Sequence, residues 1–138
     1  MKVLLDTNVI VSAVTTRGLC ADVFRAVLAE HELVTCPQVL YEVRHILSTK
    51  FSVPEHLISE YLELIEHDAI IAESEDLPSI PIKDKDDVKI VASAITAGVQ
   101  VLVTGDREVQ NLKSIGKVKI MSPRAFWELL AAQPGGAS

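Results

Sequence analysis

Short apolar runs alternate with helical patterns along almost the whole chain, and this alternation limits the folds open to it. A strand buried inside a parallel sheet reads as a short continuous apolar run, whereas a helix repeats its apolar residues every three or four positions. Five runs are predicted to be strands: residues 2–5, 33–36, 69–72, 99–103 and 118–121. The pattern predicts an α/β fold, a three-layer α/β/α sandwich around a central five-stranded, mainly parallel sheet.

Helices are predicted between these strands from apolar periodicity and from start and stop residues. Pro37 suits the first position of a helix, Pro54 and Pro123 open two further helices, and Gly98 suits a C-terminal cap. The predicted helices are residues 19–30, 37–49, one from 54 that includes 57–65, 86–97, a short one after 106, and 123–130. Residues 73–85, acidic and proline-bearing, are predicted to form a connecting loop. At 138 residues the chain suits one domain, predicted as 1–133 with a flexible tail at 134–138.

The net charge of -6 argues against a passive nucleic-acid binder, which normally carries a basic face. It does not exclude an enzyme that holds a phosphodiester through divalent cations. No apolar run reaches the roughly 18 residues of a membrane helix, and an acid at position 6 comes too early for a secretory signal. A cytoplasmic location is expected, with Cys20 and Cys36 as free thiols and no metal-binding histidine cluster.

Two acids follow predicted strands directly. Asp6 comes after the first strand and Asp106 shortly after the fourth, so both emerge at the carboxyl edge of a parallel sheet, where such folds bind ligands. Each acid could instead cap the helix that follows it. Helix capping and a functional role both remain open for these two residues.

Two further acids lie on predicted helices. Asp87 precedes Ile90 and Val91 by three and four positions respectively, which places its side chain on the inward stripe of that helix. An inward carboxylate is costly unless a base or a cation pairs with it. Glu42 flanks the apolar stripe of its own helix, where either a site beside the helix or a solvated ion pair is possible.

Helix capping alone would not hold these acids together. Two carboxylates about 4 Å apart repel by roughly 4 kcal/mol at an effective dielectric constant near 20. The favourable interaction of one carboxylate with a helix N-terminus is only about 0.3–1 kcal/mol. A divalent cation could hold them, and an all-oxygen set of ligands suits Mg²⁺ or Mn²⁺.

The chain resembles the PIN-domain nucleases, in particular VapC-like toxins of toxin–antitoxin systems. Four blocks carry the resemblance in order: V-L-L-D-T-N-V at 3–9, Y-E-V at 41–43, D-D-V-K-I-V-A-S-A at 86–94, and V-L-V-T-G-D at 101–106. The short D-T-N and T-G-D sequences are unspecific separately, whereas the four blocks in order are specific. The resemblance implies a PIN-like fold and Mg²⁺- or Mn²⁺-dependent cleavage of single-stranded RNA by metal-activated water. It also implies inhibition by a cognate antitoxin and a homodimer.

The same resemblance implies roles for individual residues. The metal-binding, catalytic acids would be Asp6, Glu42, Asp87 and Asp106, and the supporting positions Asn8, Thr104 and Asp86. Asp84, Asp86 and Asp87 crowd one segment, and Asp87 is chosen as the ligand for its family spacing to residues 90–92 and its inward position. Asp86 could instead contribute through an outer-shell water. The candidate contacts to RNA phosphate are Arg17, Arg44, Lys85, Lys89 and Arg107, each of which alone is better explained as an ordinary solvated charge.

Two other functions remain open from the sequence. The chain could be a catalytically silent PIN-fold module that binds a protein partner. It could also be a Mg²⁺-dependent phosphotransfer domain, although Asn8 stands where a D-x-D motif requires a second acid.

Overall fold

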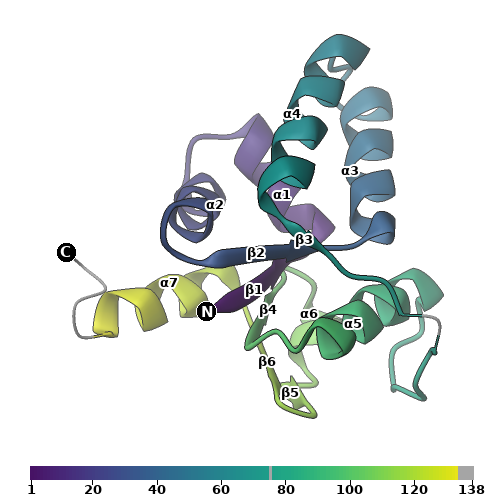
Figure 1. The fold of residues 1–138 in the computed structure, drawn as a ribbon, viewed down its shortest axis with the longest axis vertical. Coiled ribbons are helices and arrows are strands. Elements are labelled where there is room, and N and C mark those ends of the chain that lie inside the picture. The colour runs from purple at the N-terminus through teal and green to yellow at the C-terminus, as the bar shows by residue number, and fades with distance from the viewer. Residues whose placement is uncertain (75, 134–138) are drawn as a thin grey trace.

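The computed structural model of the chain describes residues 1–74 and 76–133, and its centre is a six-stranded sheet in the order β3-β2-β1-β4-β6-β5 (Figure 1). The strands are β1 (Lys2–Leu5), β2 (Glu32–Thr35), β3 (Ile70–Ile71), β4 (Val101–Val103), β5 (Ser114–Ile115) and β6 (Val118–Met121). β1, β2, β3, β4 and β6 are parallel, as predicted, and β5 pairs antiparallel with β6. The predicted mainly parallel α/β sheet is therefore confirmed.

The prediction of five strands was one too few. β5 has only two residues and no apolar run, so its sequence carries no strand signal. It forms because Gly116, with a positive φ of 57°, turns the chain back and lets Ile115 pair with Val118.

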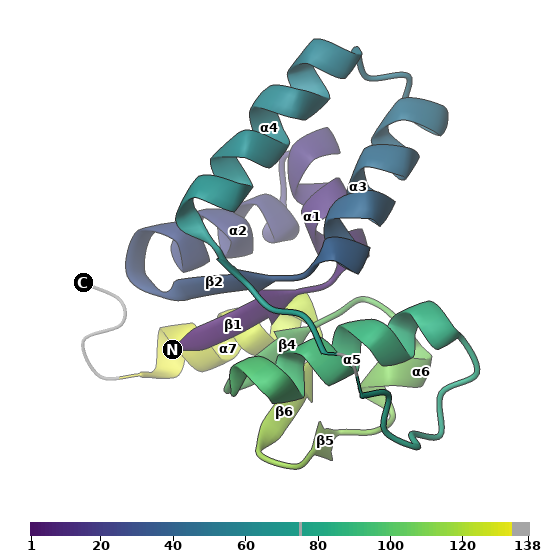
Figure 2. The same cartoon turned by 45° about the vertical axis from the view of Figure 1, so that its right-hand side comes forward.

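Helices cover both faces of the sheet. The helices are α1 (Thr7–Thr15), α2 (Leu19–Glu30), α3 (Pro37–Thr49), α4 (Glu55–Asp68), α5 (Lys85–Ala97), α6 (Arg107–Gln110) and α7 (Pro123–Ala132). Figures 1 and 2 show α1 to α4 on one side of the sheet and α5 and α6 on the other, while α7 packs against β6 and α2. This arrangement is the predicted three-layer sandwich.

Local sequence accounts for the helix ends. Pro37 occupies the first turn of α3, and the Asp84 side chain caps α5 by accepting a hydrogen bond from the Asp86 amide at 2.8 Å. Gly98 ends α5 with a φ of 67°, in the left-handed region that glycine adopts without strain. The core between the layers includes Leu4 and Phe126, both fully buried.

Several smaller predictions can also be compared with the structure. Cys20 and Cys36 are free thiols, as predicted. No helix among residues 1–74 and 76–133 is long and apolar enough to cross a membrane. The predicted tail, 134–138, lies outside the described residues, and the domain boundary at 133 stays a prediction.

Candidate active site

The adjacent ends of β1 and β4 form the base of the site. Leu5 pairs with Val103 in the parallel register, and the Asp6 amide donates to the Val103 carbonyl at 2.9 Å. Asp6 and Thr104, the residues that follow these two strands, therefore lie side by side at the carboxyl edge. This is the edge at which the sequence predicted a site.

Three donors hold the Asp6 carboxylate, which is only 5% exposed. The Thr7 amide donates to Oδ1 at 2.8 Å, so Asp6 does cap α1. The Thr104 hydroxyl donates to Oδ2 at 2.6 Å, and the Asn8 amide group reaches the same oxygen at 3.4 Å. Burial raises the pKa of Asp6 even though the Thr104 and Thr7 hydrogen bonds oppose the rise, and the charges of Glu42 and Asp106 raise it further.

Thr104 and Asn8 tie the β1–α1 turn to the β4–α6 turn. The Thr104 hydroxyl that donates to Asp6 also accepts a hydrogen bond from the Asp106 amide at 3.0 Å. Asn8 Oδ1 accepts from the Gly105 amide at 2.9 Å. A Cβ on Gly105 would lie 3.1 Å from that oxygen, so the close approach of the two turns favours glycine.

Asp106 follows β4 by three residues and caps α6. Its Oδ1 accepts a hydrogen bond from the Glu108 amide at 2.8 Å. The Gln110 side chain donates to the Thr104 carbonyl at 2.7 Å and closes the turn that carries Asp106. Capping and membership of the acidic site are therefore compatible for both strand-end acids.

Glu42 is fixed from two directions by residues that the sequence did not point to. The Thr7 hydroxyl donates to Oε1 and the Gln38 amide group to Oε2, both at 2.8 Å. Gln38 precedes Glu42 by one helical turn, a spacing that brings side chains together and could have signalled the pair. The contact with Thr7 joins α3 to the start of α1, and only the tertiary fold creates it.

Asp87 carries the strongest electrostatic signal of the site. Its pKa is raised to about 7, first by desolvation and then by the charges of Asp6, Asp84, Asp106 and Glu42. No hydrogen bond from the described part of the chain reaches its carboxylate. The four predicted acids therefore share one region closely enough to repel each other's charge.

Asp86, in contrast, lies outside this group. Its side chain is exposed and pairs with Lys89 at 3.6 Å on the solvent side of α5. It is not among the groups that raise the pKa of Asp87. The two neighbouring acids are thus placed differently, with Asp87 towards the acidic group and Asp86 towards solvent.

The candidate phosphate-binding cations are dispersed. Arg44 pairs with Glu55, and Lys89 pairs with Asp86. Arg107 and Lys85 are exposed first residues of α6 and α5, next to the acidic edge. Arg17 is exposed after the far end of α1, away from the edge where that helix starts.

The donor set of the site fits a hard divalent cation in its chemistry. All of its ligating atoms are oxygens, and the mutual charging of the acids is what a cation would relieve. As the side chains stand, however, no three His, Cys, Asp or Glu residues within 1–74 and 76–133 are grouped to hold a metal ion. A cation would therefore be held through bridging waters or after rotation of an acid, and Asp87, without a hydrogen bond, is the acid best able to rotate.

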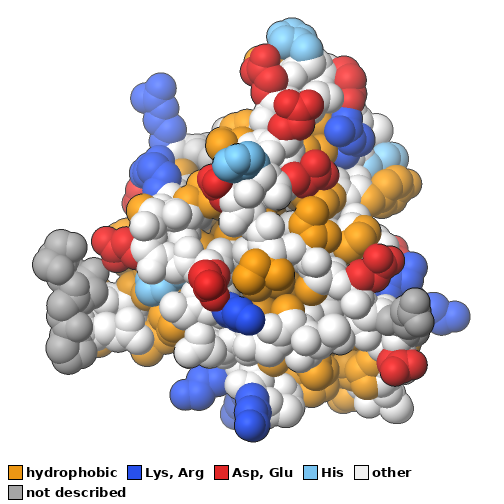
Figure 3. All heavy atoms as spheres, in the orientation of Figure 1, with side chains coloured by type: hydrophobic (Ala, Val, Ile, Leu, Met, Phe, Trp, Pro, Cys, Tyr) orange, Lys and Arg blue, Asp and Glu red, His pale blue; other side chains and the backbone are white. Residues whose placement is uncertain are grey.

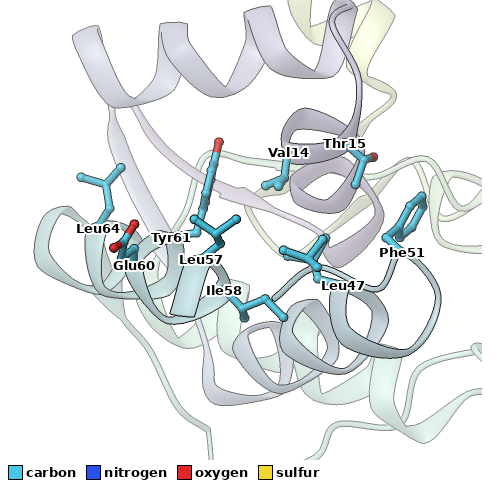
Figure 4. Close-up of a pocket in the computed structure, with 10 residues that line it drawn as sticks. Val14, Thr15, Leu47, Phe51, Leu57, Ile58, Glu60, Tyr61 and Leu64 are labelled. Carbon is cyan, nitrogen blue, oxygen red and sulfur yellow. The ribbon is translucent and has the colours of Figure 1, made fainter. Parts of the chain in front are cut away.

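A separate apolar groove of about 640 Å³ lies between α1, the end of α3, and α4. Figure 4 shows Leu57 and Tyr61 of α4 facing Val14 of α1, with Phe51 at the far end. Within the predicted helix at 57–65, Ile58, Leu62 and Ile65 are buried in the core, whereas Leu57 and Leu64 remain exposed. Acidic side chains gather over α4 in Figure 3.

Comparison with known proteins agrees with this fold. The family model described as "PIN domain" matches residues 2–108. The chain is similar to a crystal structure of VapBC2 from Rickettsia felis bound to a DNA fragment from their promoter (TM-score 0.62, 17% identity, covering 88% of this chain and 98% of that one). It is also similar to VapBC-1 from nontypeable Haemophilus influenzae (TM-score 0.61, 17% identity, covering 90% of this chain and 99% of that one). No curated protein matches the sequence. At 17% identity, the two structures establish a common fold.

Proposed function

Because the chain belongs to the PIN domain family, we propose that it is a metal-dependent endoribonuclease that cleaves single-stranded RNA. Asp6, Glu42, Asp87 and Asp106 would hold Mg²⁺ or Mn²⁺. The observation that carries the proposal is the hydrogen-bonded geometry at the carboxyl edge of the sheet. Thr104 links Asp6 to the turn that carries Asp106, and Thr7 links the start of α1 to Glu42. The raised pKa of Asp87 agrees with an acidic group at this edge. The family match gives no support to the phosphotransfer alternative.

The neighbouring residues would keep the acids in place for this chemistry. Thr104 and Thr7 orient the Asp6 carboxylate, and Gln38 together with Thr7 orients both oxygens of Glu42. A bound cation would supply a Lewis acid and would lower the pKa of a coordinated water. The four acids repel an RNA phosphate unless a cation compensates their charge. A site that binds RNA through a cation is therefore compatible with the negative net charge of the chain.

The test is cleavage of end-labelled single-stranded RNA, double-stranded RNA and single-stranded DNA, in Mg²⁺, in Mn²⁺ and in a chelator. We expect cleavage of the single-stranded RNA only, and only with a metal. Asp6→Asn, Glu42→Gln, Asp87→Asn and Asp106→Asn should each lower kcat by about 100-fold or more, whereas Asp86→Asn, the exposed neighbour, should retain activity. Folded variants of the four acids that cut as fast as the wild type would refute the assignment.

We further propose that the chain is the toxin of a toxin–antitoxin pair and that the apolar groove binds its antitoxin. The groove is open, and the side chains on its α4 wall include the exposed Leu57 and Leu64. α4 carries five acids and no lysine or arginine, so an amphipathic helix with a basic flank would complement it. A small protein encoded next to this chain, if the neighbouring reading frame specifies one, would be the candidate partner.

Co-expression with that neighbour tests the partner proposal. We expect the tagged wild-type chain to capture the neighbour and to be inhibited by it. The control variant Ile95→Asp, at an exposed apolar position on α5 outside the groove, should behave in the same way. Leu57→Asp should abolish both without changing cleavage by the chain alone. Equal capture by Leu57→Asp would exclude the groove as the binding surface.

A non-catalytic binding module is the second candidate function, because the acids as placed do not form a three-ligand group within the described ranges. Calorimetric titration with Mn²⁺ separates the two, since a silent module would release no binding heat. The homodimer and the cytoplasmic location stay predictions. Light scattering of the purified chain tests the homodimer.

A further inference from the structure

A cavity of about 320 Å³ lies next to Glu42, one of the four acids. Residues at the start of α3, in the loop after β3 and on α5 line it, among them Pro37, Gln38, Ser74, Leu77 and Ser93. Its volume is at the lower end of the range for small-molecule sites, which is about 300–1,000 Å³. A ligand here would be about the size of a nucleoside.

One side chain connects the cavity to the site. Gln38 lines the cavity and also donates its amide hydrogen to Glu42 at 2.8 Å. Cys36, which forms part of the floor, directly follows β2 and so lies at the same sheet edge as Asp6 after β1. A group in the cavity would therefore adjoin whatever the acids hold.

The floor of the cavity is neutral and polar. Cys36 is 1% exposed and Ser93 is 4% exposed, and burial raises the pKa of the Cys36 thiol, which keeps it uncharged. The Ser93 hydroxyl donates to the Lys89 carbonyl at 2.9 Å, which leaves its oxygen able to accept a hydrogen bond. These groups can recognise the donors and acceptors on the edge of a neutral ligand.

The walls are partly open and combine apolar residues with one acid, Glu73, and one base, Lys89. Pro37 lines one part of the cavity, and Leu77 lines another while remaining 52% exposed. A flat ring that covered Leu77 would remove apolar surface from water. Lys89, also in the wall, pairs with Asp86 only at 3.6 Å and at the surface, so its ammonium remains available to a phosphate.

We infer that this cavity receives one unpaired nucleobase of the RNA, next to the phosphodiester held at the acids, with Lys89 on the adjoining phosphate. The inference rests on the proposed nuclease function. A base in a duplex is stacked and its Watson–Crick edge is occupied, so it cannot enter such a cavity, and the subsite would select single strands. It would also give the enzyme a preference for one base beside the cut.

The first test fills the cavity. Ser74→Trp places a large ring in it, and Ser79→Trp, an exposed position in the same loop outside the cavity, is the matched control. On RNA libraries, Ser74→Trp should lose the wild-type base preference and about tenfold in kcat/KM, which corresponds to one good contact. Ser79→Trp should behave as the wild type. An unchanged preference and rate in Ser74→Trp would refute the subsite.

The second test needs no cleavage. In metal-free buffer, 5′-mononucleotides should shift the backbone amide NMR signals of Cys36, Leu77 and Ser93, whereas ribose 5-phosphate should not. Equal shifts with ribose 5-phosphate, or none with any nucleotide, would overturn the inference. Base-dependent shifts in a protein that cleaves no RNA would keep the subsite and reject the proposed function, so the two failures are distinguishable.

Discussion

Replacing Asp87 by Asn should stabilise the metal-free protein at alkaline pH. In the folded state the pKa of Asp87 rises from 3.8 to about 7, through desolvation and the charges of Asp6, Asp84, Asp106 and Glu42. A folded pKa above the unfolded value favours folding when the group is protonated. The corresponding stability is fully present below about pH 4 and is lost as the pH rises to about 7.

The size of the effect follows from the shift. A rise of about three units in the pKa corresponds to about 4 kcal/mol of unfolding free energy, at about 1.4 kcal/mol per unit. Solvent screening of this half-buried carboxylate reduces the free energy to about 1–2 kcal/mol. Asp87→Asn should therefore raise the free energy of unfolding by about 1–2 kcal/mol at pH 8. At pH 4 the two proteins should differ little.

Urea unfolding in a chelator, at both pH values, measures this difference. Asp86→Asn is the matched control, because its carboxylate is exposed and lies outside the acidic group; it should change stability by less than about 0.5 kcal/mol. Adding Mn²⁺ at 100 times its Kd should stabilise the wild type by about 2.7 kcal/mol and remove the advantage of the variant. Destabilisation by Asp87→Asn at pH 8 in the chelator, or an equal effect at both pH values, would refute the reasoning.

Three other substitutions test neighbouring contacts. Thr104→Val removes the hydroxyl that serves Asp6 and should cost about 1–3 kcal/mol of unfolding free energy in urea; a cost near zero would show that the hydrogen bond is unimportant. Gln38→Leu releases one oxygen of Glu42 and should lower kcat for RNA cleavage about tenfold while leaving the thermal midpoint within a few degrees; unchanged kcat would contradict a positioning role. Gly98→Ala strains a backbone with a φ of 67° and should lower the free energy of unfolding by about 1 kcal/mol in the same urea assay. An unchanged urea midpoint would contradict this prediction.

The elements that were predicted well are those whose signals are local. The helices at 19–30 and 37–49 begin and end as predicted, because apolar spacing and Pro37 act over a few residues. β5 was missed because the turn at Gly116 creates its pairing with β6. A two-residue strand without an apolar run cannot be distinguished from loop in the sequence.

The site shows the same division. The positions of Asp6 and Asp106 at strand ends and of Asp87 on the inward face of its helix were predictable, because strands and helices have regular geometry. The hydrogen bond from Thr7 to Glu42 joins residues 35 positions apart and depends on how α3 packs against α1. No pattern in the sequence carries that information.

The central claim is that the four acids form a metal-dependent ribonuclease centre, and a Mn²⁺ titration of RNA cleavage tests it most directly. Initial rates on an end-labelled single-stranded RNA are measured for the wild type, the Asp6→Asn/Asp87→Asn double variant, and Asp86→Asn, each shown to be folded by circular dichroism. The account predicts a rate that rises and saturates with Mn²⁺ in the wild type and in Asp86→Asn, and no cleavage by the double variant. A folded double variant that cleaves as fast as the wild type would contradict it.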